Sequence, residues 1–167
     1  FEDEKNILDK LSKRLNNLNQ SLSILIGIAE PTPDIQIPKL YNSVVILEQG
    51  TWRIVARKQL LPTYDVFDEK RYFRSAENSS ILNLTYQKKI WKIGITICED
   101  IWVEQCLQNE KISGKDPIRS LEEEKLDLLI NLSASPFIQS KSLVRQRIAA
   151  KAAIRLSCPV IYVNQVG

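Results

Sequence analysis

Apolar and polar residues follow two different periods along this chain, and the two periods predict a mixture of helices and strands. In residues 2–20 the apolar side chains recur every three or four positions between charged and amide residues, which is typical of an amphipathic helix. Residues 21–29 form a short β-branched run that ends before two prolines, so they predict a buried strand. Residues 40–47 and 51–57 predict the two strands of a hairpin with a tight turn at Gly50.

After this hairpin comes a polar and aromatic loop at residues 58–73, followed by a further series of strands and helices. Loops of this composition commonly carry functional sites. The later elements are expected, in chain order, as a surface connection at 74–83, paired strands at 84–89 and 90–97, the first turns of a helix at 101–107, a polar loop at 111–117, a short acidic helix at 118–125, a strand at 126–132, a basic-faced helix at 143–156 and a strand at 160–163.

Strands joined partly by hairpins and partly by helices predict an α/β domain with a mixed sheet and helices on its faces. A chain of 167 residues, 44% of them hydrophobic, is long enough for one sizeable core and short for two. Polar groups stand at three predicted strand ends, namely at Lys58, at Cys98 and at residues 133–135. Open α/β sheets bind ligands at such strand ends, so these groups are the first candidates for a site.

The 23 basic and 20 acidic residues give a net charge of +3, spread along the chain without a block of one sign. This balance argues against a nucleic-acid or acidic-membrane partner. No apolar run approaches the roughly 18 residues needed to span a bilayer, and the N-terminal stretch is charged instead of signal-like. We therefore expect a soluble, cytoplasmic protein.

Histidine is absent from the sequence, and this absence excludes a set of mechanisms within it. Neither a Ser-His-Asp triad, nor a Cys-His pair, nor a histidine metal site can operate without it. The three cysteines lack metal-type spacing and predict neither a disulfide framework nor a zinc site. Any chemistry must rest on cysteine, lysine, aspartate, glutamate or tyrosine side chains.

Cys98 ends the predicted strand 90–97 and is followed directly by two carboxylates, Glu99 and Asp100. A helix starting here would stabilise the thiolate through its unpaired N–H groups and its dipole, as in a nucleophile elbow with cysteine as the nucleophile. The alternative is that Cys98 is a small buried hydrophobe, the usual fate of a free cysteine. For Lys58 the alternative is a solvated lysine at a strand end.

Three stretches together resemble the nitrilase, or carbon-nitrogen hydrolase, superfamily. They are KQLLPTYDVFDEKRYF at residues 58–73, GITICEDIW at 94–102 and NLSASPF at 131–137. Within the superfamily this combination is most similar to the glutaminase domain of glutamine-dependent NAD synthetases, and the likeness covers residues 40–167. The resemblance implies a four-layer α-β-β-α sandwich with mixed sheets, incomplete at both ends, and a homo-oligomer.

The resemblance also implies a Glu-Lys-Cys catalytic set, which suits a chain without histidine. Cys98 would attack the side-chain amide carbon of glutamine, releasing ammonia and leaving a glutamyl thioester. Lys58 would place its ammonium beside the developing oxyanion, together with the backbone N–H of Glu99. Glu69 matches the supporting glutamate of the family, which would orient Lys58.

Further positions match places that surround the glutamine substrate in this branch of the family. They are Tyr64, Glu99, Trp102, Ser135 and Lys141. Glu99 suits the α-ammonium of glutamine and Lys141 its α-carboxylate, while Trp102 would form an apolar wall. The alternatives are core packing for Trp102 and an exposed position at the start of a helix for Lys141. The resemblance implies no metal ligands.

One departure from the family pattern concerns the general base. In the family this base is a glutamate after the first strand, in a motif like PELxLTGYP, and no such motif occurs here. Glu30 lies on the following predicted strand, in the wrong place. We therefore expect residues 1–167 to be an internal piece of one glutaminase domain, with the base before residue 1 and a synthetase domain after residue 167. Alone it should be inactive and poorly soluble, because sheet edges and apolar faces would be exposed.

The leading hypothesis is therefore glutamine hydrolysis that supplies ammonia for ATP-dependent conversion of deamido-NAD to NAD. ATP and magnesium would belong to the synthetase domain of the same chain, and residues 1–167 would need no cofactor. Two alternatives stay open: a stand-alone amidase of the same superfamily, and a non-catalytic interaction domain in which Cys98 is an inert thiol.

Overall fold

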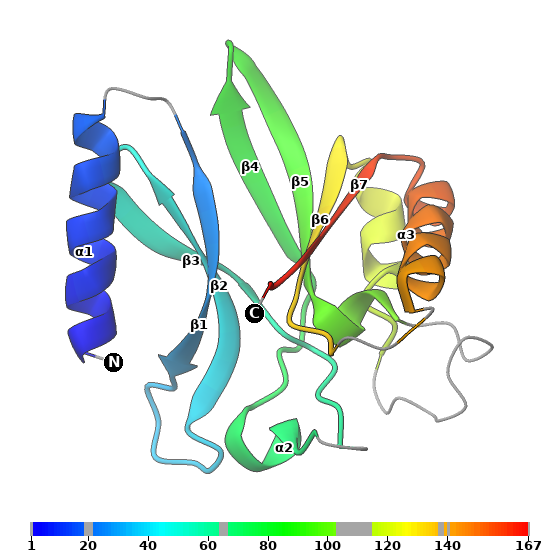
Figure 1. Cartoon of the computed structure of the whole chain (residues 1–167), viewed down its shortest axis with the longest axis horizontal. Helices are drawn as coiled ribbons and strands as arrows, with labels where there is room; N and C mark the ends of the chain where they lie inside the picture. The colour runs from blue at the N-terminus through cyan, green and yellow to red at the C-terminus, as the bar shows by residue number, and fades with distance from the viewer. Residues whose placement is uncertain are drawn as a thin grey trace.

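The computed structural model describes residues 2–18, 22–63, 67–102, 115–136, 139 and 141–166. These residues form two β-sheets, two long helices and three short helices of one or two turns (Figure 1). In chain order the elements are α1 (Glu2–Asn17), β1 (Ile24–Pro31), β2 (Leu40–Glu48), β3 (Thr51–Arg57), α2 (Glu69–Tyr72), β4 (Ser80–Tyr86), β5 (Lys89–Ile97), the 3-10 helices η1 (Cys98–Ile101) and η2 (Arg119–Glu124), β6 (Leu128–Ser133), α3 (Lys141–Leu156) and β7 (Val160–Asn164).

The first sheet is antiparallel, with the strand order β1-β2-β3. Its β2-β3 hairpin turns at Gln49 and Gly50, whose φ angles are 50° and 77°. Two consecutive positive φ angles match the right-handed twist of the flanking strands, and glycine adopts such an angle without steric cost. The hairpin predicted around Gly50 is confirmed.

The second sheet is mixed, with the strand order β4-β5-β6-β7. Strands β4 and β5 are antiparallel and joined by a turn at Gln87 and Lys88, whereas the β5-β6 and β6-β7 pairs are parallel. The predicted mixed α/β class is confirmed. The strands are divided between two sheets, however, and not gathered in the single mixed sheet that local patterns suggested.

Hydrophobic clusters on both sides of β2 explain this division. Alternate residues of a strand point to opposite faces, so Val45 and Leu47 pack with α1 while Val44 and Ile46 pack with β4 and β5 of the second sheet. Residues 43–47 are consequently buried without a break. A third cluster joins α3 and η2 to β6, and Figure 1 shows α1 and α3 at opposite ends of the molecule with the sheets between them.

Short segments differ most from the sequence-based prediction. The expected surface connection at 74–83 already contains the start of β4, and one helical turn, α2, interrupts the expected loop at 58–73. The acidic segment expected as a helix at 118–125 is the 3-10 helix η2, followed by Lys125 with φ 48°. Segments of one or two turns hold too few residues for periodicity to define their geometry.

The helix expected to begin at Ile101 is not formed there. Ile101 instead closes the 3-10 helix η1, and Trp102 leaves helical geometry with φ −93° and ψ 48°. Residues 103–107 of that expected helix lie outside the described part of the chain. A four-residue 3-10 turn is too short to supply the dipole of a regular helix, which affects the chemistry of Cys98.

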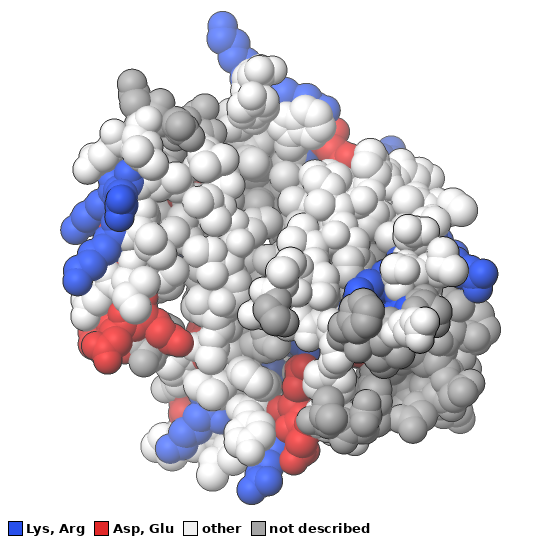
Figure 2. Space-filling view, in the orientation of Figure 1, with Lys and Arg blue, Asp and Glu red and all other residues white. Residues whose placement is uncertain are grey.

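Charged side chains lie in small separate groups on the face shown in Figure 2, around a broad area without charge. Ile161 and Val163, on the edge strand β7 of the second sheet, are exposed. These exposed apolar side chains agree with the expectation from the sequence that residues 1–167 would expose sheet edges and apolar faces. None of the helices in the described part of the chain is long and apolar enough to cross a membrane.

Candidate active site

A pocket of about 560 Å³ is lined by residues of both sheets. Its walls come from β1 and β2 on one side and from the C-terminal parts of β5, β6 and β7 on the other. Lys58, Glu69, Cys98 and Ser133 all line this pocket. Three polar strand ends that lie far apart in the sequence therefore meet at one place, as the strand-end argument predicted.

Cys98 directly follows β5 and begins η1, with its backbone in the left-handed region at φ 48°. A non-glycine residue rarely adopts this conformation, and such strained residues cluster at functional sites. Cys98 is half-buried at this turn and lines the pocket. This is the sharp turn expected of a nucleophile elbow.

Burial raises the pKa of the Cys98 thiol above its ordinary value. The ammonium of Lys58 acts in the opposite direction, the carboxylates of Glu99 and Glu69 raise the pKa further, and a hydrogen bond from the Ser133 hydroxyl lowers it. The prediction that a helix N-terminus would stabilise the thiolate is therefore wrong, because a 3-10 turn replaces the helix and burial has the larger effect. A base must remove the thiol proton for Cys98 to act as a nucleophile near neutral pH.

Lys58 is the largest fully buried side chain of the described residues, and its ammonium is paired with a carboxylate. Its Nζ donates to Glu69 Oε1 at 2.6 Å and to Glu69 Oε2 at 2.7 Å. The Glu69 side chain is 17% exposed, and the Glu69 N–H donates to the Pro62 carbonyl oxygen. The alternative reading of Lys58 as a solvated lysine is wrong.

A buried chain of hydrogen bonds leads to the Cys98 thiol from β5 and β6. The Thr96 hydroxyl donates to Asn131 Oδ1 at 2.9 Å, which fixes the orientation of the amide. Asn131 Nδ2 then donates to Ser133 Oγ at 2.8 Å. Because Ser133 Oγ accepts this bond, its own proton is free to point toward the Cys98 sulfur. Ser133 belongs to the polar strand end at 133–135 that the sequence pointed to, whereas Thr96 and Asn131 were not predicted as site residues.

The sequence singled out Asp100 only as a carboxylate close to Cys98 and gave it no role, although its side chain is almost fully buried beside the site. It accepts backbone N–H groups from the segment that follows Lys58 and from the residue before Cys98. The signal available in the sequence was a carboxylate two residues after the candidate nucleophile, inside an otherwise apolar stretch. Such a residue is costly to bury unless its oxygens are satisfied.

The residues predicted to bind substrate are less clearly gathered around the pocket. Glu99 and Ser135 are buried. The described lining of the 560 Å³ pocket includes none of Glu99, Trp102, Ser135 and Lys141. Trp102 packs in the cluster formed with α3, as its alternative reading expected, and the half-buried Lys141 places Nζ 5.6 Å from the centre of its ring. Tyr64 lies outside the described residues.

Ser135 stands in a short segment held by β7 and α3. Its N–H donates to Asn164 Oδ1 at 3.0 Å, and its carbonyl oxygen accepts from Arg145 Nη2 at 3.0 Å. These bonds fix the backbone that continues from Ser133. The polar strand end at 133–135 is therefore anchored on two sides.

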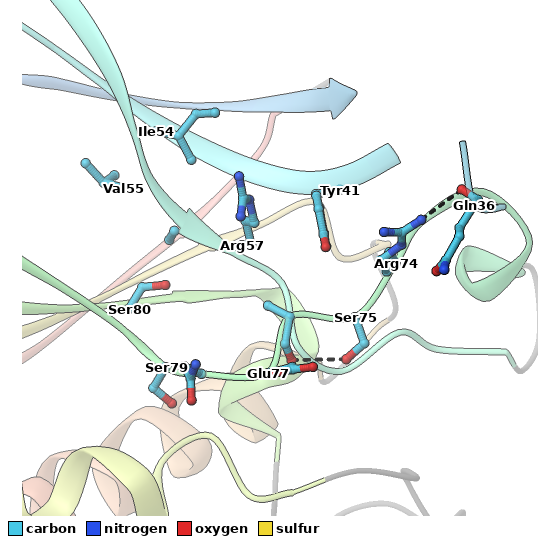
Figure 3. A pocket seen from close by; sticks show the side chains of 13 residues that line it. Gln36, Tyr41, Ile54, Val55, Arg57, Arg74, Ser75, Glu77, Ser79 and Ser80 are labelled. Carbon is cyan, nitrogen blue, oxygen red and sulfur yellow. Dashed lines mark hydrogen bonds between the residues drawn. The ribbon is translucent and has the colours of Figure 1, made fainter. Parts of the chain in front are cut away.

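A second pocket, of about 780 Å³, lies near the start of β2, the end of β3 and the start of β4 (Figure 3). Its two cations are already neutralised inside the protein. Arg57 pairs with the buried Glu30, and Arg74 donates to both carboxylate oxygens of Asp34, at 2.7 and 2.9 Å. No cysteine or lysine is among the described residues that line it, so the smaller pocket is the better candidate for catalysis.

Glu30 is thus committed to Arg57 and to the Ser43 hydroxyl, which donates to it at 2.7 Å. It is not among the described residues lining the pocket that holds Cys98. This agrees with the prediction that Glu30 is misplaced for a general base. Among the described residues, no group of three or more histidine, cysteine, aspartate or glutamate side chains is arranged to hold a metal ion.

Sequence comparison places this arrangement in a family. The chain belongs to the carbon-nitrogen hydrolase family, whose model matches residues 4–167. It is 41% identical over 150 residues to the glutamine-dependent NAD(+) synthetase of Synechocystis sp., an alignment that covers 88% of this chain and 26% of that protein. It is 31% identical over 166 residues to the enzyme of the same name from Thermotoga maritima, covering 99% of this chain and 25% of that protein.

Structural comparison gives the same result. A structure of glutamine-dependent NAD+ synthetase from Acinetobacter baumannii, in complex with ADP, superposes with a TM-score of 0.71 at 28% identity, covering 96% of this chain and 27% of that one. The chain therefore spans about a quarter of the length of these relatives. The resemblance that the three motifs indicated is confirmed for the family and for the likeness to NAD synthetases.

Proposed function

We propose that this chain is part of the glutaminase domain of a glutamine-dependent NAD synthetase and hydrolyses the side-chain amide of glutamine. The observation that carries the proposal is the placement of Cys98 in one pocket with the buried Lys58–Glu69 ion pair, in a chain that has no histidine. Family membership and the likeness to NAD synthetases support it. On this proposal residues 1–167 form part of a single domain of a longer protein.

The first chemical step is attack by the Cys98 thiolate on the amide carbon of glutamine. A C–S bond forms while the carbonyl π electrons move to oxygen, and the ammonium of Lys58 and the backbone N–H of Glu99 stabilise the oxyanion. When the C=O bond re-forms, the C–N bond breaks and ammonia leaves with the proton taken from the thiol. Water then hydrolyses the glutamyl thioester to glutamate and restores the Cys98 thiol.

Glu69 is badly placed to take the thiol proton. Both of its carboxylate oxygens accept hydrogen bonds from Lys58, and it is the single carboxylate among the described lining residues of the pocket. We assign it the role of holding Lys58 in place. For the general base we propose the glutamate that the family resemblance implies, in the motif that residues 1–167 lack.

Substrate recognition on this proposal follows from charge. Glu99 receives the α-ammonium of glutamine and Lys141 its α-carboxylate, while Tyr64, Trp102 and Ser135 complete the site. The Lys141 ammonium already lies 5.6 Å from the centre of the Trp102 ring, which puts two of these groups side by side.

The ammonia passes to a synthetase domain of the same chain, which uses ATP and magnesium to convert deamido-NAD to NAD. The proposal includes the four-layer α-β-β-α sandwich and the homo-oligomer that the family resemblance implies. The order of the hydrophobic clusters, from α1 through the two sheets to α3, supports this layering.

The test compares two ammonia sources in the full-length protein. Cys98→Ala should abolish NAD formation from glutamine and leave NAD formation from free ammonia intact, because only the first needs the thiol. Cys158→Ala is the matched control: this thiol is buried in the α3 cluster, away from the pocket, and both activities should persist. Glutamine-driven NAD formation that survives Cys98→Ala would refute the proposal and return attention to an interaction domain.

A further inference from the structure

Asp100 accepts hydrogen bonds on both of its carboxylate oxygens. Its Oδ1 accepts the backbone N–H of Gln59 at 3.1 Å and that of Leu60 at 2.8 Å, and its Oδ2 accepts the N–H of Ile97 at 3.1 Å. The side chain is only 2% exposed, so these bonds replace solvent almost completely. Three oriented donors satisfy a carboxylate that would otherwise be costly to bury.

The three donors flank the two candidate catalytic side chains. Gln59 and Leu60 directly follow Lys58 at the end of β3, whereas Ile97 directly precedes Cys98 at the end of β5. The two segments leave different sheets and lie about 40 positions apart in the sequence. One carboxylate therefore ties the backbone that carries the ammonium to the backbone that carries the thiol.

The bond to Ile97 also closes the strained turn at Cys98. Asp100 reaches back three residues to the N–H that precedes η1, in the manner of the acidic residue of a capping box. Such a bond compensates part of the cost of the positive φ at Cys98. The same side chain thus holds the turn closed and anchors the Lys58 segment.

We propose that Asp100 is a positioning residue that sets the distance between the Lys58 ammonium and the Cys98 thiol. The inference rests on the proposed glutaminase function, since it concerns the alignment of the two groups in that reaction. A misplacement of reacting groups by about 1 Å can cost on the order of 10²-fold in rate. We call the three backbone hydrogen bonds to the Asp100 carboxylate the Asp100 clamp. Loss of this clamp should therefore lower kcat strongly and change KM little.

Asp100→Asn is the decisive substitution because it keeps the volume but has only one accepting oxygen. Its NH₂ group must face either Ile97 or the Gln59–Leu60 pair, where a donor meets a donor and one arm of the clamp opens. Asp127→Asn is the matched control. Asp127 likewise accepts a backbone N–H, that of Lys92 at 2.8 Å, but at the opposite end of β5.

The experiment uses the full-length protein and counts reactive sites by labelling Cys98 with an electrophilic glutamine analogue. For Asp100→Asn, kcat per labelled site should fall on the order of 10²-fold with glutamine, with KM nearly unchanged and ammonia-driven NAD formation intact. The pH dependence of Cys98 alkylation should also shift upward, since Lys58 lowers the thiol pKa less from a displaced position. If Asp100 had a purely structural role, Asp100→Asn would reduce the number of labelled sites. It would leave kcat per labelled site and the pH dependence of Cys98 alkylation unchanged.

A second pair of variants decides the case if Asp100→Asn does not accumulate as folded protein. Gln59→Pro deletes one donor of the clamp, and Gln59→Ala keeps that N–H while removing the side-chain bond to Ser79. The clamp predicts a lower kcat per labelled site for Gln59→Pro than for Gln59→Ala. Equal values for the two would overturn the inference, as would Asp100→Asn behaving like Asp127→Asn. Failure of the proposed function itself appears separately, as glutamine-driven activity that survives Cys98→Ala.

Discussion

Lys58 Nζ lies 2.6 Å from one carboxylate oxygen of Glu69 and 2.7 Å from the other, and the Lys58 side chain is only 1% exposed. Removing the carboxylate leaves a buried ammonium without its partner, which commonly costs about 3 to 5 kcal/mol. We expect Glu69→Gln to destabilise the protein by about 3 kcal/mol, the lower end of that range, because Glu69 is partly exposed. The urea concentration at the unfolding midpoint measures this loss.

Adding Lys58→Met to Glu69→Gln supplies the internal check. The double variant has no unpaired charge, and Met fills a similar volume, so it should be more stable than Glu69→Gln alone. The surface pair Arg53–Glu48, at 3.0 Å, is the control, and Glu48→Gln should cost less than about 1 kcal/mol. A double variant no more stable than Glu69→Gln would show that the buried charge is not the cause.

The Cys98 thiol should be alkylated slowly at neutral pH and faster as the pH rises, because burial raises its pKa. Lys58→Met should move this rise to higher pH, since the Lys58 ammonium lowers the thiol pKa, and Ser133→Ala should move it in the same direction by removing a hydrogen bond. Iodoacetamide labelling over a pH series, followed by peptide mass analysis, measures the profile.

Lys92→Met is the control for charge alone. Lys92 lies on β5, the strand before Cys98, but it pairs with Glu124 and is not among the described residues lining the pocket, so its loss should leave the Cys98 profile in place. Equal shifts for Lys58→Met and Lys92→Met would contradict a specific effect of Lys58 on the thiol.

Burial raises the pKa of Asp100 from 3.8 to about 6. In the unfolded chain this carboxyl titrates near 3.8, so between about pH 4 and 6 the folded state binds a proton that the unfolded state does not. The contribution of Asp100 to stability is therefore fully present below pH 3.8 and lost as the pH rises through about 6, by on the order of 3 kcal/mol. Asp100→Asn should remove this component.

Urea unfolding of wild type and Asp100→Asn, at intervals from about pH 2 to 7, measures the difference. Asp127→Asn provides a control of opposite sign, because the hydrogen bonds from Lys89 and Lys92 lower the pKa of Asp127. The Asp127 contribution is present above the unfolded pKa and lost as the pH falls. A wild-type minus Asp100→Asn difference that does not change with pH would contradict the raised pKa.

Local sequence patterns predicted the regular elements well because each depends on neighbouring residues. The amphipathic period of residues 2–20 defines α1, and the hairpin at Gly50 follows from one glycine between two β-branched runs. The partition into two sheets could not be derived in this way, since it depends on which face of β2 meets α1 and which meets β5. That choice is made by packing between distant segments.

The same distinction between local patterns and contacts of distant segments applies to the candidate site. Motif resemblance pointed to Cys98, Lys58 and Glu69, and the structure brings them into one pocket. The motifs gave no indication of the positive φ at Cys98, because no local rule places a cysteine in the left-handed region. The Asp100 clamp was equally hidden, since its donors are backbone groups and any residue type other than proline could supply them.

Gly94, on β5, lies so close to the side chains of Leu126 and Leu129 that a larger residue does not fit there. A Cβ at this position would lie 2.7 Å from Leu126 Cδ1 and 3.0 Å from Leu129 Cδ1, both in the buried core. Overpacking of this kind typically costs about 1 to 3 kcal/mol, more than the few tenths to about 1 kcal/mol that alanine gains over glycine in the unfolded chain. Gly94→Ala should therefore lower the urea midpoint.

Gly27→Ala, on β1, is the matched control because a Cβ there meets no atom within 4 Å. That variant should be as stable as wild type or slightly more so. Leu126→Val removes the Cδ1 atom responsible for the closest contact, so the loss caused by Gly94→Ala should be smaller in the Leu126→Val background. Additive losses in the double variant would mean that the contact with Leu126 does not cause the destabilisation.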